Sequence, residues 1–171
     1  MIRSPSVEPR QHHASATMQV NPEINSRLNQ CLRDQLTAIN QFFLHARMCK
    51  NRGLNQLNDR EYRCSIKAMK QADDLIERVL FLEGLPNLQN LGKLMIGENV
   101  PEIISNDLKL CLEIRSNLVA AINAFELQQD YVSRDLCTEL LEETEAQIDW
   151  LESQQWLIEG AGLPNYLQEM M

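Results

Sequence analysis

The stretch that decides the fold is DREYRCSIKAMKQADDLIERVLFLEGLPNLQNLG, residues 59–92. Apolar side chains recur in it close to the 3.6-residue period of an amphipathic helix, at Ile66, Met69, Ala72, Ile76, Val79, Leu80 and Leu82. Asp59 is the expected N-cap, and Gly84 and Pro86 are expected to end the helix. The stretch therefore predicts one long helix, preceded by a short turn over 53–58.

The same period extends over three further segments. They run from Asn21-Pro22 to about Gly53, from Pro101 to about Gln129, and from about Tyr131 to Ile158, and 163–171 could add a short fifth helix. Gly160-Ala161-Gly162 is expected to break the fourth helix. The turn-rich segment 85–99 is long enough to be a crossover lying against the helices. The fold class predicted is all-α: a ferritin-like four-helix bundle with a long crossover between helices 2 and 3 and a short C-terminal fifth helix.

Composition narrows the functional class. The chain has 171 residues and a net charge of −8, which argues against nucleic acid as a partner. No apolar run reaches the roughly 18 residues of a membrane span. The five cysteines form no C-x-x-C pair, so reduced thiols in a cytoplasmic protein are expected rather than a disulfide framework. Phe42 beside Phe43 gives the first helix apolar positions beyond one stripe, which indicates an oligomer.

Residues 1–17, MIRSPSVEPRQHHASAT, lack hydrophobic periodicity and are expected to be a disordered extension before a domain at 18–171. They contain no apolar core of a secretory signal. His12-His13 could bind a metal adventitiously, but a solvated tail is the preferred interpretation.

Five blocks carry a family resemblance: AINQFFLHARM (38–48), LNDREY (57–62), IERVLFLEGLPNLQNLGKL (76–94), DYVSRDL (130–136) and IDWLE (148–152). Together they resemble bacterioferritin, from about Met18 to the C-terminus. The resemblance implies a 24-subunit shell built of two-fold dimers, which stores ferric mineral and binds haem b between paired subunits.

The family's di-iron ferroxidase centre takes one Glu from each of two helices and a Glu-x-x-His from each of the other two. The positions in this sequence that match those six ligands are Gln35, Ala68, Gln71, Cys111, Thr144 and Gln147. Neutral amides, a thiol, a hydroxyl and a methyl group cannot compensate the charge of two iron ions. No di-iron centre and no catalytic residue is therefore expected in this chain.

A displaced metal site is a weaker alternative. The acidic residues Glu139, Glu142, Glu143 and Glu145 are spread around the fourth helix, which is typical of a solvated face. Cys111 with Gln71 and Gln147 is a poor ligand set, and His45 is expected to be a packed or surface residue. Arg63 and Lys67 match positions of an inner-surface iron site in the family, where basic residues would repel Fe²⁺.

The positions that match the family's haem site, in contrast to the di-iron positions, keep the family's residue types. Met69 matches the methionine that supplies an axial ligand to the haem iron from each of two subunits. A methionine on an apolar stripe is more often core packing, but its neighbours also match the family's haem pocket and dimer interface: Leu36, Ile39, Asn40, Phe43, Tyr62, Ile66 and Lys70. The resemblance thus implies a haem-binding subunit.

We therefore expect a haem-binding, ferroxidase-inactive subunit of an iron-storage shell. It would co-assemble with a ferroxidase-active bacterioferritin subunit and use haem, with a ferredoxin as possible donor, to reduce mineral and release iron. A purely structural shell subunit and a conventional ferroxidase remain as alternatives.

Overall fold

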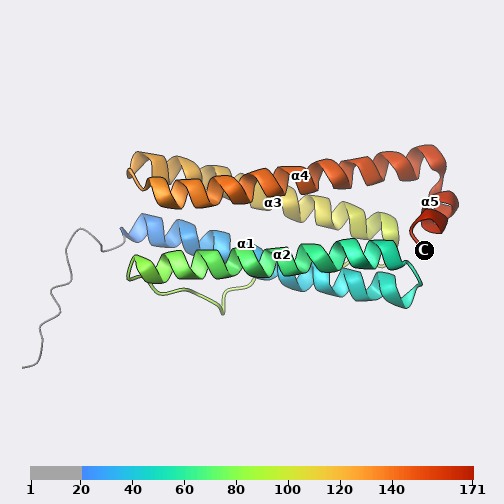
Figure 1. Ribbon diagram of the computed structural model, residues 1–171, viewed down its shortest axis with the longest axis horizontal. Coiled ribbons are helices and arrows are strands. Elements are labelled where there is room, and N and C mark those ends of the chain that lie inside the picture. The colour runs from blue at the N-terminus through green and yellow to red at the C-terminus, as the bar shows by residue number, and fades with distance from the viewer. Residues whose placement is uncertain (1–20) are drawn as a thin grey trace, which may run out of the picture.

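Four long helices and one short helix make up the part of the chain that the computed structural model describes, residues 21–171. They are α1 (Pro22–Asn51), α2 (Asn55–Phe81), α3 (Val100–Leu127), α4 (Tyr131–Ala161) and α5 (Leu163–Glu169). In Figure 1 the α1–α2 pair lies beside the α3–α4 pair, and α5 folds across one end. The predicted all-α ferritin-like bundle with a long crossover and a fifth helix is confirmed. The expectations for residues 1–17 and for His12-His13 lie outside the described residues.

The start of α2 differs from the prediction. Asp59 is not its N-cap: the helix begins at Asn55, after Leu54, whose side chain makes no capping hydrogen bond. The Gln56 amide instead donates to the Met170 carbonyl oxygen at 3.0 Å, and the Gln56 side chain donates to the Glu169 carbonyl oxygen at 2.9 Å. Acceptors in the C-terminal segment thus pair with donors at the start of α2, where the sequence predicted a local cap by Asp59.

The end of α2 agrees with the predicted stop at Gly84 and Pro86: the last helical residue is Phe81, and Leu82 is the C-cap. Glu83 has a φ of 60°, and the Gly84 amide donates to the Val79 carbonyl oxygen at 2.9 Å, which closes the last turn. Gly84 has a packing role, because a Cβ atom there would lie 2.5 Å from the Asn25 side-chain oxygen of α1. In α4 the helix continues through Gly160 to Ala161, and only Gly162, with a φ of 83°, breaks it.

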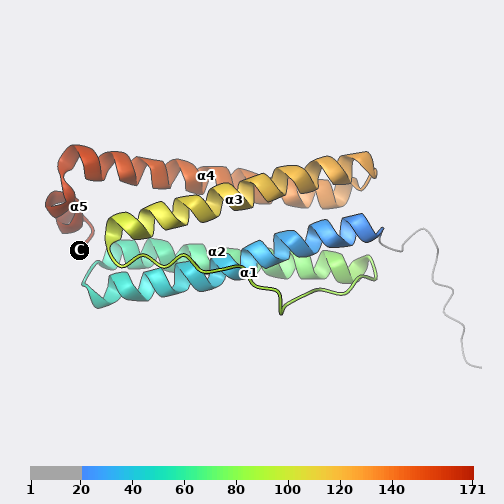
Figure 2. The same cartoon turned by 180° about the vertical axis from the view of Figure 1, so that it is seen from behind.

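The crossover over 82–99 runs the length of the α1–α2 pair, as Figure 2 shows from behind. One polar stripe of α1 accepts hydrogen bonds from its backbone. The Asn87, Gly92 and Met95 amides donate to Asn29, Thr37 and Gln41 at 2.7, 2.9 and 3.0 Å. The Gly97 amide donates to His45 Nε2 at 3.0 Å. The predicted contact between the crossover and the bundle is therefore confirmed, and it is made largely by backbone groups.

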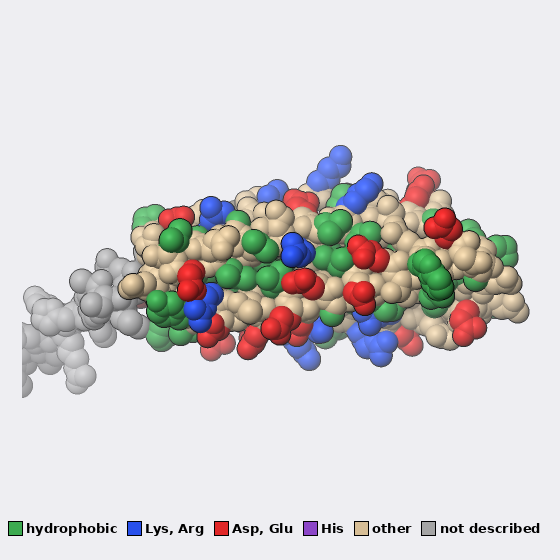
Figure 3. Space-filling model, turned by 90° about the horizontal axis from the view of Figure 1, so that it is seen from above, with side chains coloured by type: hydrophobic (Ala, Val, Ile, Leu, Met, Phe, Trp, Pro, Cys, Tyr) green, Lys and Arg blue, Asp and Glu red, His purple; other side chains and the backbone are tan. Residues whose placement is uncertain are grey.

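The core combines aliphatic side chains from all four long helices. Phe42 is buried while Phe43 is 47% exposed, so α1 has the second apolar face that the sequence predicted. On the face formed by α3 and α4, acidic, basic and apolar side chains are interspersed (Figure 3). The five cysteines are free thiols, and no helix among the described residues is long and apolar enough to cross a membrane.

Candidate functional site

A pocket of about 390 Å³ at the centre of the bundle is lined by residues of all four long helices, and we call it the bundle-centre pocket. It contains five of the six positions that were matched to di-iron ligands: Gln35, Gln71, Cys111, Thr144 and Gln147. Ala68 is buried in the adjoining core, with 3% of its surface exposed. The structure thus brings together residues that lie more than a hundred positions apart in the sequence.

Most polar side chains of the pocket already have partners within the protein. The Thr144 hydroxyl donates to the Leu140 carbonyl oxygen at 2.7 Å, and Gln71 donates to a Glu143 carboxylate oxygen. Gln147 Oε1 accepts from Arg60 Nη2 at 2.7 Å and from Cys64 Sγ at 3.4 Å. The pocket therefore presents amides, a hydroxyl and thiols where a di-iron site needs carboxylates.

The thiol of Cys111 is held in its neutral form. Burial raises its pKa well above the usual value, and the negative charge of Asp107 raises it further. A thiol binds metals as the thiolate, so this environment makes Cys111 a weak ligand. Glu139, Glu142, Glu143 and Glu145 are all exposed, as expected of a solvated face, although Glu143 also lines the pocket.

The residues matched to the haem pocket lie on the outer side of α1 and α2, and we call this surface the Met69 face. Every one of them is exposed or half-buried: Leu36, Ile39, Asn40, Phe43, Tyr62, Ile66, Met69 and Lys70. Met69 is 50% exposed, so it does not pack in the core of its own bundle. The rings of Phe43 and Tyr62 lie 6.3 Å apart and join the two helices at this surface.

The comparisons with known proteins agree with this architecture. The ferritin-like domain family matches residues 25–161. A bacterial ferritin of Synechocystis sp. is 40% identical over 155 residues, which cover 90% of this chain and 99% of that protein. A bacterioferritin of Brucella melitensis is 39% identical over 151 residues, covering 88% and 94%, and a bacterial ferritin of Pseudomonas aeruginosa is 37% identical over 155 residues, covering 90% and 100%. This chain belongs to the bacterioferritin family.

Sequence reasoning missed a buried polar cluster in this bacterioferritin fold. His45, Glu61 and Asp107 each have no exposed surface, and their ligand atoms all lie within 4.8 Å of one another. Asp107 Oδ1 accepts from Gln41 Nε2 at 2.9 Å and lies 2.8 Å from His45 Nδ1. His45 was expected to be a packed or surface residue, and it is fully buried.

The hydrogen bonds of His45 decide what this cluster can do. Since the Gly97 amide donates to Nε2, the ring proton is on Nδ1 and is donated to Asp107. Both ring nitrogens are therefore occupied, which disfavours His45 as a metal ligand. Both oxygens of Glu61 and Asp107 Oδ2 have no hydrogen-bond donor among residues 21–171.

A proton accounts for these carboxylate oxygens. Burial raises the pKa of Glu61 well above its usual range, and the negative charge of Asp107 raises it further. A protonated Glu61 can donate to Asp107, so both carboxyl groups gain a partner. A sequence signal for this role exists, because Glu61 is in register with the buried Ser65, Ala68 and Ala72 on the inner side of α2.

Two arginines were also missed. The Arg47 guanidinium carbon lies 4.7 Å from the Tyr62 ring centroid and 5.5 Å from that of Phe43, at the Met69 face. The Arg60 guanidinium carbon lies 4.4 Å from the Trp150 ring centroid, beside the bundle-centre pocket. Such cation–aromatic contacts depend on tertiary packing, so the sequence gives little signal for them.

Proposed function

We propose that this chain is a haem-binding, ferroxidase-inactive subunit of a bacterioferritin iron-storage shell. The observation that carries the proposal is the half-exposed thioether of Met69 on an apolar face. A methionine that served only core packing would be buried. A half-exposed methionine on an apolar surface instead marks a contact with a partner or a ligand. A second copy of the chain, placed about a two-fold axis, would bring two thioethers toward one haem.

The donor set of the Met69 face fits haem b. A thioether is a soft, neutral axial ligand for haem iron, and when bound the group supplies one-electron transfer at a potential that the ligand helps to set. Phe43, Tyr62 and Ile66 would provide apolar contact around the ring, while Arg47 and Lys70 add positive charge that suits haem propionates. These residues bind and orient the cofactor between subunits.

The bundle-centre pocket supports the second half of the proposal. Its matched ligand positions carry no carboxylate, and Arg60, Arg63 and Lys67 add positive charge around it. Both features oppose the binding of two ferrous ions. Iron oxidation would then depend on a ferroxidase-active subunit in a mixed 24-subunit shell, and electrons from a ferredoxin would reduce ferric mineral through haem.

A purely structural role is the second candidate, favoured by apolar side chains exposed near one end of the bundle. Leu80, Phe81, Leu127 and Val132 are 56%, 57%, 84% and 61% exposed. Side chains of this size suit contacts with other subunits whether or not haem is bound.

The decisive experiment is native mass spectrometry of shells isolated from their own cells through a tag on this chain. We expect a mixed shell with one haem for each pair of these subunits. A shell of this chain alone without haem would contradict the haem role and leave the structural candidate. A separate assay of the purified chain, in which Fe²⁺ was oxidised clearly faster than in buffer, would identify a conventional ferroxidase.

A further inference from the structure

We propose that the bundle-centre pocket binds a small oxyanion of the inorganic phosphate type, through Arg60, Arg63 and Lys67. Such an anion site would stand where the family has a cation site, and it does not depend on haem binding.

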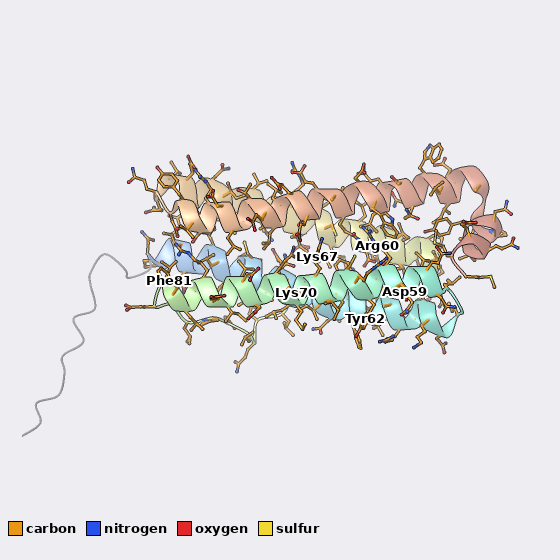
Figure 4. The ribbon with its side chains drawn as sticks, viewed as in Figure 1. Asp59, Arg60, Tyr62, Lys67, Lys70 and Phe81 are labelled. Atoms are coloured by element: carbon orange, nitrogen blue, oxygen red, sulfur yellow. The ribbon has the colours of Figure 1, made fainter. Side chains whose placement is uncertain are left out.

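The three basic residues are arranged as one group. They are spaced three and four positions apart on α2, which places them on one face of the helix, and all three line the pocket. Figure 4 shows Arg60 and Lys67 on the side of α2 that faces α4, whereas Tyr62 lies on the opposite side. Their charges therefore converge on the space between the two helix pairs.

Negative charge around the pocket is small and already engaged. Among the described residues that line it, Glu143 is the only carboxylate. It lies 3.5 Å from Lys67 Nζ and accepts a hydrogen bond from Gln71. Within residues 21–171, neither Arg60 nor Arg63 forms an ion pair. The pocket therefore keeps an excess of positive charge, which attracts an anion and repels Fe²⁺.

Two buried donors beside the pocket lack acceptors. Arg60 Nε and Gln147 Nε2 are shielded from solvent, and no acceptor in the described chain pairs with them. Arg60 is fixed by its contact with Trp150 and by its 2.7 Å hydrogen bond to Gln147 Oε1. That bond directs the Gln147 oxygen to Arg60 and leaves its NH₂ group as a donor. Both groups are donors, so they add positive partial charge beside the pocket, which favours an anion over a metal ion.

The ligand class follows from this donor set. Guanidinium groups bind planar or tetrahedral oxyanions in a bidentate manner, and lysine adds a point charge. A volume of about 390 Å³ accommodates a phosphate ion with water. Small carboxylates share part of this chemistry, so the test compares phosphate with acetate.

The test is isothermal titration of the iron-free, full-length protein with inorganic phosphate at low ionic strength. We expect saturable binding with one site per chain and much weaker binding of acetate. Arg63→Gln and Lys67→Gln should each weaken phosphate binding by about tenfold, because each removes a charge-assisted hydrogen bond. Both residues are exposed, so their substitution preserves the fold. Lys109→Gln is the matched control: it removes one exposed positive charge from α3, away from the pocket lining, and should leave binding unchanged.

A further variant distinguishes a built site from general charge attraction. Glu143→Gln removes the competing carboxylate and should strengthen phosphate binding several-fold by releasing Lys67 and Gln71. Absence of saturable binding would overturn the proposal, as would equal losses in Lys67→Gln and Lys109→Gln. Acetate binding as tight as phosphate binding would overturn the assignment to a phosphate-type ion.

Discussion

The two sides of α2 carry different chemistry in this bacterioferritin-family chain. The inner side lines the bundle-centre pocket with Arg60, Cys64, Lys67 and Gln71, and the outer side carries the Met69 face. Ala68 and Met69 are adjacent in sequence, yet 3% of one and 50% of the other is exposed. Successive helical side chains point about 100° apart, so one side can change its chemistry while the other keeps its own.

The largest expected effect concerns the outer side. Met69→Leu conserves volume but removes the thioether, so haem reconstitution should give no stably ligated haem and no Soret band. The measurement is the optical spectrum after reconstitution, with phosphate binding by the bundle-centre pocket as the readout for the inner side. Met48→Leu, on α1, is the control and should bind haem like the unmodified protein. Equal haem uptake by Met69→Leu would mean that Met69 is not the ligand.

The inner side can be tested by restoring the six family ligands. Glu at positions of Gln35, Ala68, Cys111 and Thr144, with His at positions of Gln71 and Gln147, should raise the rate of Fe²⁺ oxidation by about tenfold or more. Stopped-flow absorbance measures the rate, and haem uptake should be unaffected. A matched variant that restores only Gln35→Glu, Ala68→Glu and Gln71→His leaves the site half complete and should show no gain. If this half-restored variant oxidised iron equally fast, the gain would not come from a di-iron site.

Interior carboxyl groups should make stability depend on pH. Burial raises the pKa of Asp34 to about 6, although Asn117 and Gln30 donate hydrogen bonds to it at 2.8 and 3.2 Å. The folded chain then holds a proton that the unfolded chain loses near pH 4. The stabilisation is complete below pH 4 and is lost as pH rises through 6, by about 2–3 kcal/mol.

Thermal unfolding from pH 4 to pH 8 measures this change. Asp34→Asn cannot ionise and should give a flatter profile over the same interval. An unaltered profile in that variant would assign the pH dependence to other groups, such as Glu61.

The smallest expected effect concerns Glu61, on the inner side of α2. If Glu61 carries a proton at neutral pH, Glu61→Gln keeps its shape and can still donate to Asp107. We expect a loss of less than about 1 kcal/mol in the free energy of unfolding at pH 7. Glu61→Ala leaves a cavity and removes the donor, and should cost about 2–3 kcal/mol. A large loss in Glu61→Gln, measured by urea unfolding, would show that an ionised carboxylate is needed there.

The fold was predictable because hydrophobic period and turn residues agree along the chain. The start of α2 was placed less well: Asp59 has the residue type of an N-cap, but the C-terminal segment supplies the contacts that start the helix at Asn55. Local rules cannot anticipate a partner more than a hundred residues away.

For the site, the family resemblance located positions but not their environment. The structure shows that five of the matched positions line one pocket, and the exposure of Met69 follows from the packing of α1 and α2. The cluster of His45, Glu61 and Asp107 was missed because three helices and the crossover assemble it. The expectation that the chain lacks a di-iron centre remains a prediction.

The hydrogen bonds from the crossover to α1 have a consequence for mutational tolerance. Since Asn29, Thr37, Gln41 and His45 accept from backbone amides, the four bonds need no particular donor side chain. Space still restricts two positions, because a Cβ atom would lie 2.9 Å from Thr37 Oγ1 at Gly92 and would clash with the Ile103 backbone nitrogen at Gly97. Amide hydrogen exchange in this irregular segment should therefore be slow, and trypsin should cleave after Lys93 only slowly. Sequence drift in the crossover would therefore be absorbed at position 95 but not at Gly92 or Gly97, and a single substitution in α1 would weaken the attachment of the segment.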